Sequence, residues 1–482
     1  MTARGDDALR AFPNSILSEA VKPRLLVIED DQTVLPLVEH CARPLGFDVH
    51  ERSGRDALEQ LTNLRPHVAF VDLQMSDLSG IDVLQRARLH DPDCHVILIT
   101  EHASADVALR AVKAGALDCL SKPLDVDRLR ELLSAITDEI AQRERLLQVD
   151  AEIASQIAFQ GMVGRSAVMR ELFQSVTRLA PHVRAVLITG ETGTGKELVA
   201  RALHDIGPCR ANHFLTMDCA AVIKPLLESE LFGHVRGAFP GAMDTKVGLV
   251  ERAHEGTLLL DRVSELPLPM QSKLLRAVEQ REIQRVGSLE TRHVDVRVIA
   301  TTARDLRTDV AASRFRADLF QRLSAVHLHL PPLRERREDI PYLTAAFVQA
   351  ASQRAGRPIA SVAPAAGRRL QDAYWPGNVR ELRQVVEQAC MLGEGATLSA
   401  RDVEGAMAAT GPASPEPSAG TESVAGQVAP AGVVPDLLTT AQRDQIARVL
   451  REVGGNKAAA AKRLGVSRRS LYRWIARLDI RI

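Results

Sequence analysis

The stretch AVLITGETGTGKELVA, residues 185–200, decides the fold of the longest part of this chain. An apolar run comes first, a glycine-rich turn follows it, and a helical pattern begins at the lysine. In this order of strand, turn and helix, backbone N–H groups point at phosphates, and Lys196 can reach the β- and γ-phosphates of a nucleotide. We therefore predict an α/β nucleotide-binding unit with the candidate ATP-binding residues Gly190, Glu191, Thr192, Gly193, Thr194, Gly195, Lys196 and Glu197.

The last position of this motif departs from the general pattern. That pattern ends in Ser or Thr, whose hydroxyl holds Mg²⁺, whereas Glu197 stands here. The motif is therefore imperfect when it is taken alone. Two further strand-like runs, TLLLD at 257–261 and VDVRVIATT at 294–302, extend the same α/β unit, and a helical segment follows it to about Met407.

A second α/β unit is expected in the first 135 residues. Apolar runs alternate there with helical patterns: LLVIED at 25–30, HVAFVDL at 67–73, HVILIT at 95–100 and DCLSKP at 118–123. Continuous apolar strands that alternate with helices predict a parallel sheet covered on both faces.

Each of these four runs ends in a polar residue that phosphoryl chemistry can use. The carboxyl ends of such strands meet at one edge of the sheet, where ligands bind. Three carboxylates there suit Mg²⁺, a hard cation that prefers oxygen ligands. Asp72 would be the nucleophile that forms an aspartyl phosphate, and the other residues would support it. Ordinary turn chemistry is the better explanation for any one of them alone, but the set together favours a site: Glu29, Asp30, Asp72, Thr100 and Lys122.

Length and composition limit the remaining possibilities. The 482 residues suffice for two to four domains, at roughly 100 to 200 residues each. The 61 basic and 61 acidic side chains balance, so a surface for nucleic acid requires a local asymmetry. The six cysteines lack metal-ligand spacing, and no long apolar stretch or signal-peptide pattern occurs. We expect a cytoplasmic protein that does not enter a membrane.

The asymmetry lies at the C-terminus. Between Ala408 and Pro435, 19 of 28 residues are Ala, Gly, Pro or Ser, which predicts a flexible tether. The next 47 residues carry 11 Lys or Arg and 4 Asp or Glu. Within them, NKAAAAKRLGVSRRSLYRWI at 456–475 reads as two helices joined by a turn at Gly465. The start of such a second helix meets base edges, so the candidate DNA-binding residues are Arg468, Arg469, Ser470 and Arg473.

The N-terminal unit resembles the receiver domain of response regulators. The resemblance rests on the acidic pair, on DLQMSDLSG, on the lone Thr and on SKP. It implies phosphorylation of Asp72 by a sensor histidine kinase, with Mg²⁺ held by Glu29, Asp30 and Asp72. Ser76 replaces a proline that the family usually has in this loop, which removes no catalytic group.

The central unit resembles the AAA+ domain of sigma-54-dependent activators of the NtrC class. The matching segments are ESELFGHVRGAF, EGTLLLD, VDVRVIATT, FRADLFQRL, LPPLRERREDIP and WPGNVREL. The family's own nucleotide loops commonly end in Lys-Glu. The resemblance implies Asp261 beside Mg²⁺ and ATP, and Arg380 as a sensor of nucleotide. It also implies Arg316 and Arg322 as fingers that complete a neighbouring subunit's site, hence a ring.

Several departures fall where the family works. The polymerase-contact loop reads Gly237, Ala238, Phe239, Pro240, Gly241, Ala242, so Pro240 replaces the Thr that is thought to touch sigma-54. Proline has no backbone N–H and fixes φ, which puts this contact in doubt.

The catalytic positions also differ. Arg262 replaces the catalytic Glu, and a guanidinium cannot act as a base near neutral pH. Asp218 replaces the Asn that pairs with that Glu, and Ala303 replaces the sensor Asn. We expect slow or absent hydrolysis. Asp218 and Arg262 form either a charge-swapped pair or two independent losses.

The C-terminal segment resembles the Fis-type helix-turn-helix that ends NtrC-class regulators. Because those proteins are dimeric, the resemblance implies inverted-repeat DNA sites. The whole chain also bears a weaker resemblance to the branch that controls hydrogenase genes.

These observations together predict an α/β multidomain fold. It consists of a flavodoxin-like receiver at 23–137, a helical linker at 138–160, an AAA+ domain with a helical subdomain at 161–392, a helical end and tether at 393–435, and an all-α helix-turn-helix at 436–482. Two functions remain open for this regulator: an ATP-driven activator of sigma-54 RNA polymerase, or a DNA-binding regulator that binds ATP without turning it over.

Overall fold

The computed structural model describes residues 22–410, apart from 30–32, 53–55, 76–77, 102–104, 222–223 and 394. The first α/β unit is a five-stranded parallel sheet in the order β2-β1-β3-β4-β5, the doubly wound order expected for a flavodoxin-like receiver. Its strands are β1 (Arg24–Ile28), β2 (Asp48–Arg52), β3 (Val68–Asp72), β4 (His95–Thr100) and β5 (Asp118–Ser121). Its helices are α1 (Val34–Ala42), η2 (Arg43–Leu45), α2 (Asp56–Leu64), α3 (Gly80–His90), α4 (Ala105–Lys113) and α5 (Val126–Gln156).

Helices cover both faces of this sheet, which explains why its inner strands are apolar throughout. Leu25 and Val27 belong to the core cluster that contains residues of α1 and α5. Leu26 and Ile28, which alternate with them, belong to the cluster that contains residues of α2, α3 and α4. All four side chains are fully buried, and each contributes roughly 1.5–3 kcal/mol through removal from water.

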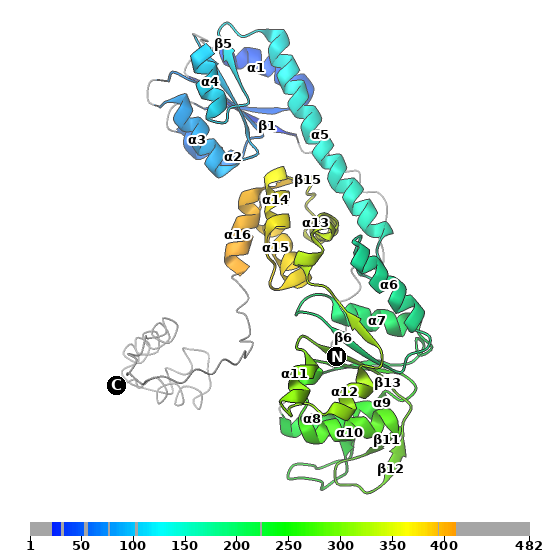
Figure 1. Ribbon diagram of the computed structural model, residues 1–482. Helices are drawn as coiled ribbons and strands as arrows, with labels where there is room; N and C mark the ends of the chain where they lie inside the picture. The colour runs from blue at the N-terminus through cyan, green and yellow to red at the C-terminus, as the bar shows by residue number, and fades with distance from the viewer. Residues whose placement is uncertain are drawn as a thin grey trace, which may run out of the picture. The chain divides into compact units, whose positions relative to one another are not determined.

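One strand of this unit was not expected: the edge strand β2 has the sequence DVHER, which carries no continuous apolar run. The helix expected as a linker at 138–160 is continuous with the last helix of the receiver, because α5 runs for 31 residues without a break across the boundary at residue 137 (Figure 1). Asp125 caps it by accepting hydrogen bonds from the N–H groups of Asp127 and Arg128. Secondary structure therefore does not mark where the receiver ends.

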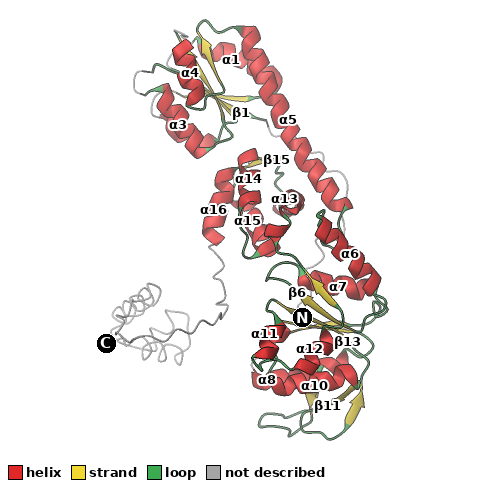
Figure 2. Cartoon of the chain, in the orientation of Figure 1, coloured by secondary structure: helices red, strands yellow, loops and turns green. Residues whose placement is uncertain are grey.

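The second α/β unit is a five-stranded parallel sheet in the order β14-β6-β13-β10-β7 (Figure 2). Its strands are β6 (Ala185–Thr189), β7 (Phe214–Asp218), β10 (Thr257–Asp261), β13 (Arg297–Thr302) and β14 (His327–His329). Its helices are α6 (Ala167–Leu179), α7 (Lys196–Ile206), α8 (Lys224–Phe232), α9 (Leu249–Arg252), α10 (Leu268–Glu279), α11 (Leu306–Ala311) and α12 (Ala317–Leu323), with a turn η3 (Val263–Glu265). The short pairs β8 (Gly233–His234) with β9 (Lys246–Val247) and β11 (Glu282–Gln284) with β12 (Thr291–His293) are antiparallel.

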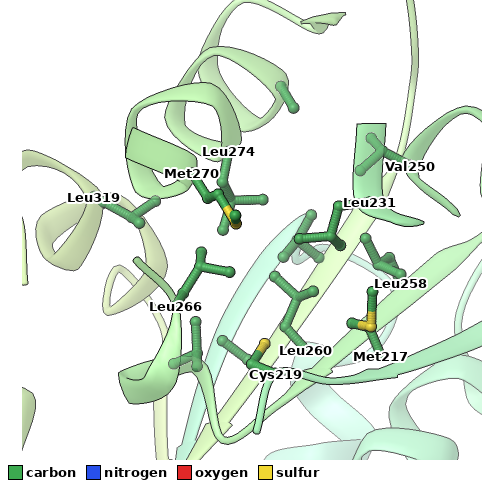
Figure 3. Close-up of a cluster of buried hydrophobic side chains, with 14 of the residues drawn as sticks. Met217, Cys219, Leu231, Val250, Leu258, Leu260, Leu266, Met270, Leu274 and Leu319 are labelled. Atoms are coloured by element: carbon green, nitrogen blue, oxygen red, sulfur yellow. The ribbon is translucent and has the colours of Figure 1, made fainter. Parts of the chain in front are cut away.

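Alternate residues of the central strands again face opposite layers. Leu258 and Leu260 of β10 pack in a cluster with residues of α8, α10 and α12, part of which Figure 3 shows. Leu259, between them, packs with residues of α6 and α7. The strand ends, and with them Asp218 and Asp261, are thereby held at one edge of the sheet.

A helical subdomain follows the sheet. It consists of η4 (Leu333–Glu335), η5 (Arg337–Asp339), α13 (Ile340–Ala355), α14 (Pro364–Asp372), α15 (Asn378–Leu392) and α16 (Ala400–Thr410), with strands β15 (Ser361–Val362) and β16 (Thr397–Leu398). Trp375 lies in its core, 2% exposed, and donates a hydrogen bond to the carbonyl of Leu370 at 2.7 Å. We call the part of this subdomain from α13 to α16 the lid, and η4 and η5 form the segment that enters it.

No helix in the described part of the chain is long and apolar enough to span a membrane. Residues 411–482, which carry the expected tether and helix-turn-helix, lie outside the described residues.

Candidate functional site

The receiver sheet brings three expected residues together at its carboxyl edge. The Lys122 ammonium lies 2.8 Å from Oε1 of Glu29 and 2.8 Å from Oδ2 of Asp72. The N–H of Gln74 donates to the other oxygen of Asp72 at 2.9 Å. Thr100, 3% exposed, ends the neighbouring strand β4. Asp72 is thus fixed at the strand end by a cation and a backbone donor.

Burial sets the charges of this cluster. Burial and a hydrogen bond with Asp72 raise the pKa of Glu29 to about 7. Burial opposes ionisation of Asp72, but hydrogen bonds with Glu29, Lys122 and the Gln74 N–H outweigh it and lower its pKa. Hydrogen bonds to the two carboxylates likewise outweigh burial at Lys122 and raise its pKa. Asp72 therefore stays ionised, as a nucleophile must.

The donor set fits a magnesium ion. Glu29 and Asp72 offer carboxylate oxygens at one sheet edge, which is the ligand type that Mg²⁺ prefers. Asp30, the third expected ligand, lies outside the described residues, as does Ser76. Within the described ranges, no group of three or more metal-ligating side chains occurs.

The glycine-rich loop joins β6 to the first turn of α7. Gly190, Gly193 and Gly195 have φ angles of 148°, 81° and 108°, which residues other than glycine rarely adopt. Lys196 begins α7, and its ammonium donates to the carbonyls of Gly190 and Glu191 at 2.7 and 2.8 Å. Burial lowers the pKa of Lys196 to about 8, against the charge of Asp261. A helix start, a glycine cradle and a lysine together fit nucleotide phosphates.

Asp261 ends β10 next to this loop. Its Oδ1 accepts a hydrogen bond from the hydroxyl of Thr301 in β13, and its carbonyl accepts from the N–H of Cys219 at 3.0 Å. The carboxylate is therefore oriented by the neighbouring strand, in the position implied for an acid beside Mg²⁺.

Asp218 and Arg262 form an ion pair, as the first of the two alternatives for these positions requires. The Arg262 Nε donates to Oδ1 of Asp218 at 2.9 Å, and its Nη2 donates to Oδ2, so the contact is bidentate. Arg262 has φ 55° and ψ 48°, and its side chain is 47% exposed. Hydrogen bonds from Arg262 and from the N–H groups of Ala220 and Ala221 outweigh burial and lower the pKa of Asp218. Ala303, exposed after β13, offers only a methyl group.

The loop Gly237–Ala242 folds back on itself. The N–H of Ala242 donates to the carbonyl of Phe239 at 3.0 Å, with Pro240 and Gly241 as the two central residues. Gly241 has φ 100°, so this is the turn type that favours Pro followed by Gly. The Phe239 ring packs edge-on against His234, with 5.0 Å between centroids. Pro240 thus stabilises a closed turn as well as removing the hydroxyl.

The three expected arginines have different surroundings. Arg316 is held within its own chain, because its guanidinium pairs with Asp318 at 2.6 Å and reaches the hydroxyl of Ser272 at 3.1 Å. Arg322 lies exposed in the last turn of α12. Arg380 lies exposed in the first turns of α15, and its backbone N–H donates to the carbonyl of Gly193 at 3.3 Å. The positive charge of Arg380 also lowers the pKa of Lys196.

Sequence reasoning missed the residues that fix the glycine-rich loop from outside. Arg334, Arg336 and Asn378 all bond to this loop. They lie in LPPLRERREDIP and WPGNVREL, segments that support the resemblance but that no spacing rule connects to the loop. Of the remaining candidates, Arg468, Arg469, Ser470 and Arg473 lie outside the described residues.

Comparisons with known proteins agree along the chain. Family models match for the response regulator receiver domain at 25–134, the sigma-54 interaction domain at 162–329, the AAA+ ATPase lid domain at 334–420, and the bacterial regulatory protein, Fis family, at 438–478.

Full-length relatives match as well. The transcriptional regulatory protein ZraR of Klebsiella oxytoca is 39% identical over 454 residues, 94% of this chain and 98% of ZraR. The response regulator protein PilR of Pseudomonas aeruginosa is 37% identical, over 95% of this chain and 99% of PilR. The regulatory protein AtoC of Escherichia coli K12 is 36% identical, over 93% and 96%. A crystal structure of NtrX from Brucella abortus with ADP is 30% identical, covers 95% of this chain and 100% of that chain, and has a TM-score of 0.48. The chain therefore belongs to the NtrC class of two-component response regulators, with a receiver, a sigma-54-interaction AAA+ domain and a Fis-type helix-turn-helix.

Proposed function

We propose that this response regulator controls transcription by binding DNA, and that its AAA+ domain binds ATP without turning it over. The observation that carries this proposal is the bidentate ion pair between Arg262 and Asp218 at the position of the family's catalytic acid. A guanidinium remains protonated at neutral pH and cannot accept a proton from the attacking water. Asp218 holds this guanidinium in place, and both of its carboxylate oxygens accept hydrogen bonds from Arg262.

The nucleotide-binding residues remain suited to their task. The loop glycines have the backbone angles that a phosphate cradle needs, and Lys196 stands at the start of α7. Asp261 is oriented toward the same edge by Thr301. Mg²⁺ bound with ATP would neutralise phosphate charge there, and Arg380 would contact the nucleotide from the lid. Binding and turnover are thereby separated in this chain.

Phosphorylation of the receiver is the input. Asp72 would attack the phosphorus of a phosphohistidine on a sensor kinase, so that an O–P bond forms as the N–P bond breaks. Mg²⁺ would offset the charge of the phosphoryl oxygens. Lys122, now bridging Glu29 and Asp72, would contact the phosphoryl group once Asp72 carries it, with Thr100 as a hydroxyl donor.

The output would be binding at inverted-repeat sites through the helix-turn-helix, with Arg468, Arg469, Ser470 and Arg473 as the proposed DNA-contacting residues. The family resemblance makes sigma-54-type promoters the first DNA sites to test for binding. Among these, the promoters of hydrogenase genes should be tested first, because the weaker resemblance is to the branch that controls them. The closed turn at Pro240 and the packing of the Phe239 ring against His234 argue against direct contact of this loop with sigma-54.

A second function has its own support. The complete set of AAA+ segments, together with exposed Arg322, fits a ring-forming and ATP-driven activator of sigma-54 RNA polymerase. On that hypothesis, the ion pair of Arg316 with Asp318 would break in the ring, and Arg316 would instead contact the nucleotide bound to the neighbouring subunit.

Steady-state phosphate release by the purified full-length protein separates the two functions. It is measured over a concentration series, because a ring forms only at high concentration, and ATP binding is measured in parallel. We expect binding that Lys196→Ala abolishes and turnover indistinguishable from that variant's background. Robust turnover that depends on Lys196 and rises with protein concentration would restore the ATP-driven activator.

A further inference from the structure

The nucleotide loop is tied to the lid by its side chain as well as by its backbone. The Glu191 carboxylate is bound on both oxygens by the Arg334 guanidinium, at 2.6 and 2.8 Å. Asn378, the first residue of α15, donates to the same carboxylate at 3.1 Å. Arg334 lies in η4, between the sheet and the lid, and its guanidinium also stacks on Tyr374, 5.1 Å from the ring centroid. One acidic side chain therefore links the loop to the segment that enters the lid and to the lid itself.

The loop backbone is bound from the same side. Three consecutive carbonyls each accept a hydrogen bond from the lid or the segment before it. The carbonyl of Thr192 accepts from the Asn378 side chain at 3.0 Å, that of Gly193 from the Arg380 N–H at 3.3 Å, and that of Thr194 from buried Arg336 at 3.0 Å.

The approach of lid and loop is close. A Cβ on Gly193 would lie 2.1 Å from the carbonyl oxygen of Gly377, so only glycine fits at this position. Asn378 also accepts from the N–H of Leu333 at 2.8 Å, and it has φ 53°. The first turn of α15 is thus fixed directly against the loop that holds the phosphates.

The side chain and the backbone of Glu191 have different partners. Its backbone carbonyl accepts from Lys196, whereas its carboxylate is directed to Arg334 and Asn378. Hydrogen bonds from Arg334 lower the pKa of Glu191, so the carboxylate is charged at neutral pH. A charged group inside a nucleotide loop opposes the binding of an anionic ligand unless its charge is offset, and Arg334 offsets it.

We propose that Glu191 is a positioning residue that clamps the lid to the nucleotide loop through Arg334 and Asn378, and so sets how long a bound nucleotide stays. On this proposal, release of the nucleotide requires the lid to move away from the loop, and that movement would break the Glu191 contacts. The clamp acts on dissociation whether or not ATP is hydrolysed, so it does not depend on the fate of Arg262.

The test is the dissociation rate of a fluorescent ADP analogue from the full-length protein, measured by stopped-flow displacement with unlabelled ADP. Glu191→Gln keeps the shape of the side chain and removes its charge, and Arg334→Met removes the guanidinium. We expect each to speed dissociation about tenfold, with the association rate changed less than twofold, because losing a charge-assisted contact acts mainly on dissociation. The double variant should be no faster than the faster single variant, because both remove one contact.

Glu335→Gln is the matched control, since Glu335 is an exposed acid in the same turn as Arg334. It should dissociate ADP at the native rate. Arg334→Lys, which keeps the charge and loses the bidentate geometry, should give an intermediate rate. Native dissociation rates in both Glu191→Gln and Arg334→Met, or equal acceleration in Glu335→Gln, would overturn the proposal. Because ADP is not a substrate, ATP turnover by the native protein would refute the proposed function and leave this result intact.

Discussion

Exchanging Arg262 for Glu and Asp218 for Asn in one chain should raise the rate of ATP hydrolysis well above that of the native protein. The double change places a carboxylate at the end of β10, beside Asp261, and gives it the amide partner that the family uses. A positioned general base contributes roughly 10²–10⁴-fold to rate. We expect a gain near the lower end, about 100-fold, because Ala303 supplies no amide at the sensor strand.

The single variants should rank in a definite order. Arg262→Glu alone sets its new carboxylate against Asp218, where an ion pair of 2.9 Å now stands. Two like charges about 4 Å apart repel by roughly 1 kcal/mol in bulk water and by more at this half-exposed edge, and about 1 kcal/mol corresponds to about fivefold in rate. Arg262→Glu should therefore hydrolyse ATP at least about five times more slowly than the double variant. Asp218→Asn alone adds no base and should stay at the native level.

Phosphate release at saturating ATP measures these rates, and a fluorescent ATP analogue reports binding in each variant. Adding Lys196→Ala to the double variant is the control, and it should return the rate to background. A double variant that binds ATP with native affinity and hydrolyses it no faster than the native protein would show that Arg262 is not what blocks turnover. Native turnover unaffected by either substitution would refute the reasoning more directly.

Three further outcomes follow from described contacts. ATP affinity should fall as pH rises from 7 to 9, because burial lowers the pKa of Lys196 to about 8 and its neutral amine must take up a proton to bind the phosphates as an ammonium. Calorimetry in two buffers would show that proton uptake, and Lys196→Arg should remove it. Pro240→Thr should loosen the closed turn by about 0.6 kcal/mol, which raises amide exchange in this loop about threefold by mass spectrometry, whereas unchanged exchange would contradict a stabilising role for the proline. Lys122→Met should destabilise the receiver by roughly 3 kcal/mol at pH 8, because two buried carboxylates lose their shared cation. That loss should shrink as pH falls through 7, since Glu29, with its raised pKa of about 7, is then protonated in the fold; equal losses of thermal stability at pH 5.5 and pH 8 would contradict this account.

Much of the architecture was predictable, because buried parallel strands carry uninterrupted apolar runs. The strands at 24–28 and 95–100 are of this kind. Three strands of the two five-stranded sheets were missed, and all three are edge strands: β2, β7 and β14. Polar side chains make up most of β2, with DVHER, and of β14, with HLH. Their sequences resemble loops because one side of each faces solvent rather than a helix.

The sites divide in a similar way. A contact between Asp218 and Arg262 could be proposed from the sequence, because the family's paired Asn and Glu are both replaced and the two new side chains carry opposite charges. The contact of Glu191 with Arg334 could not, because 143 residues separate them and both residue types are ordinary at exposed positions. Only the return of the chain from β14 toward the lid brings them together. The helix beyond residue 137 was predicted as a helical linker, but its continuity with the receiver was not, since charged residues at helical spacing do not reveal where one domain ends.

The three carbonyls of Thr192, Gly193 and Thr194 that face the lid have a consequence for signalling. Each peptide group is a rigid plane, with its oxygen on one side and the next residue's hydrogen on the other. A shift of the lid that tilts these planes also turns the N–H groups that would meet phosphate, and a phosphate that draws those N–H groups tilts the same planes back. The influence is reciprocal and equal in free energy. The orientation of these peptide planes therefore couples the position of the lid to the binding of nucleotide. A protein or domain that binds the lid would respond to the nucleotide without contacting it.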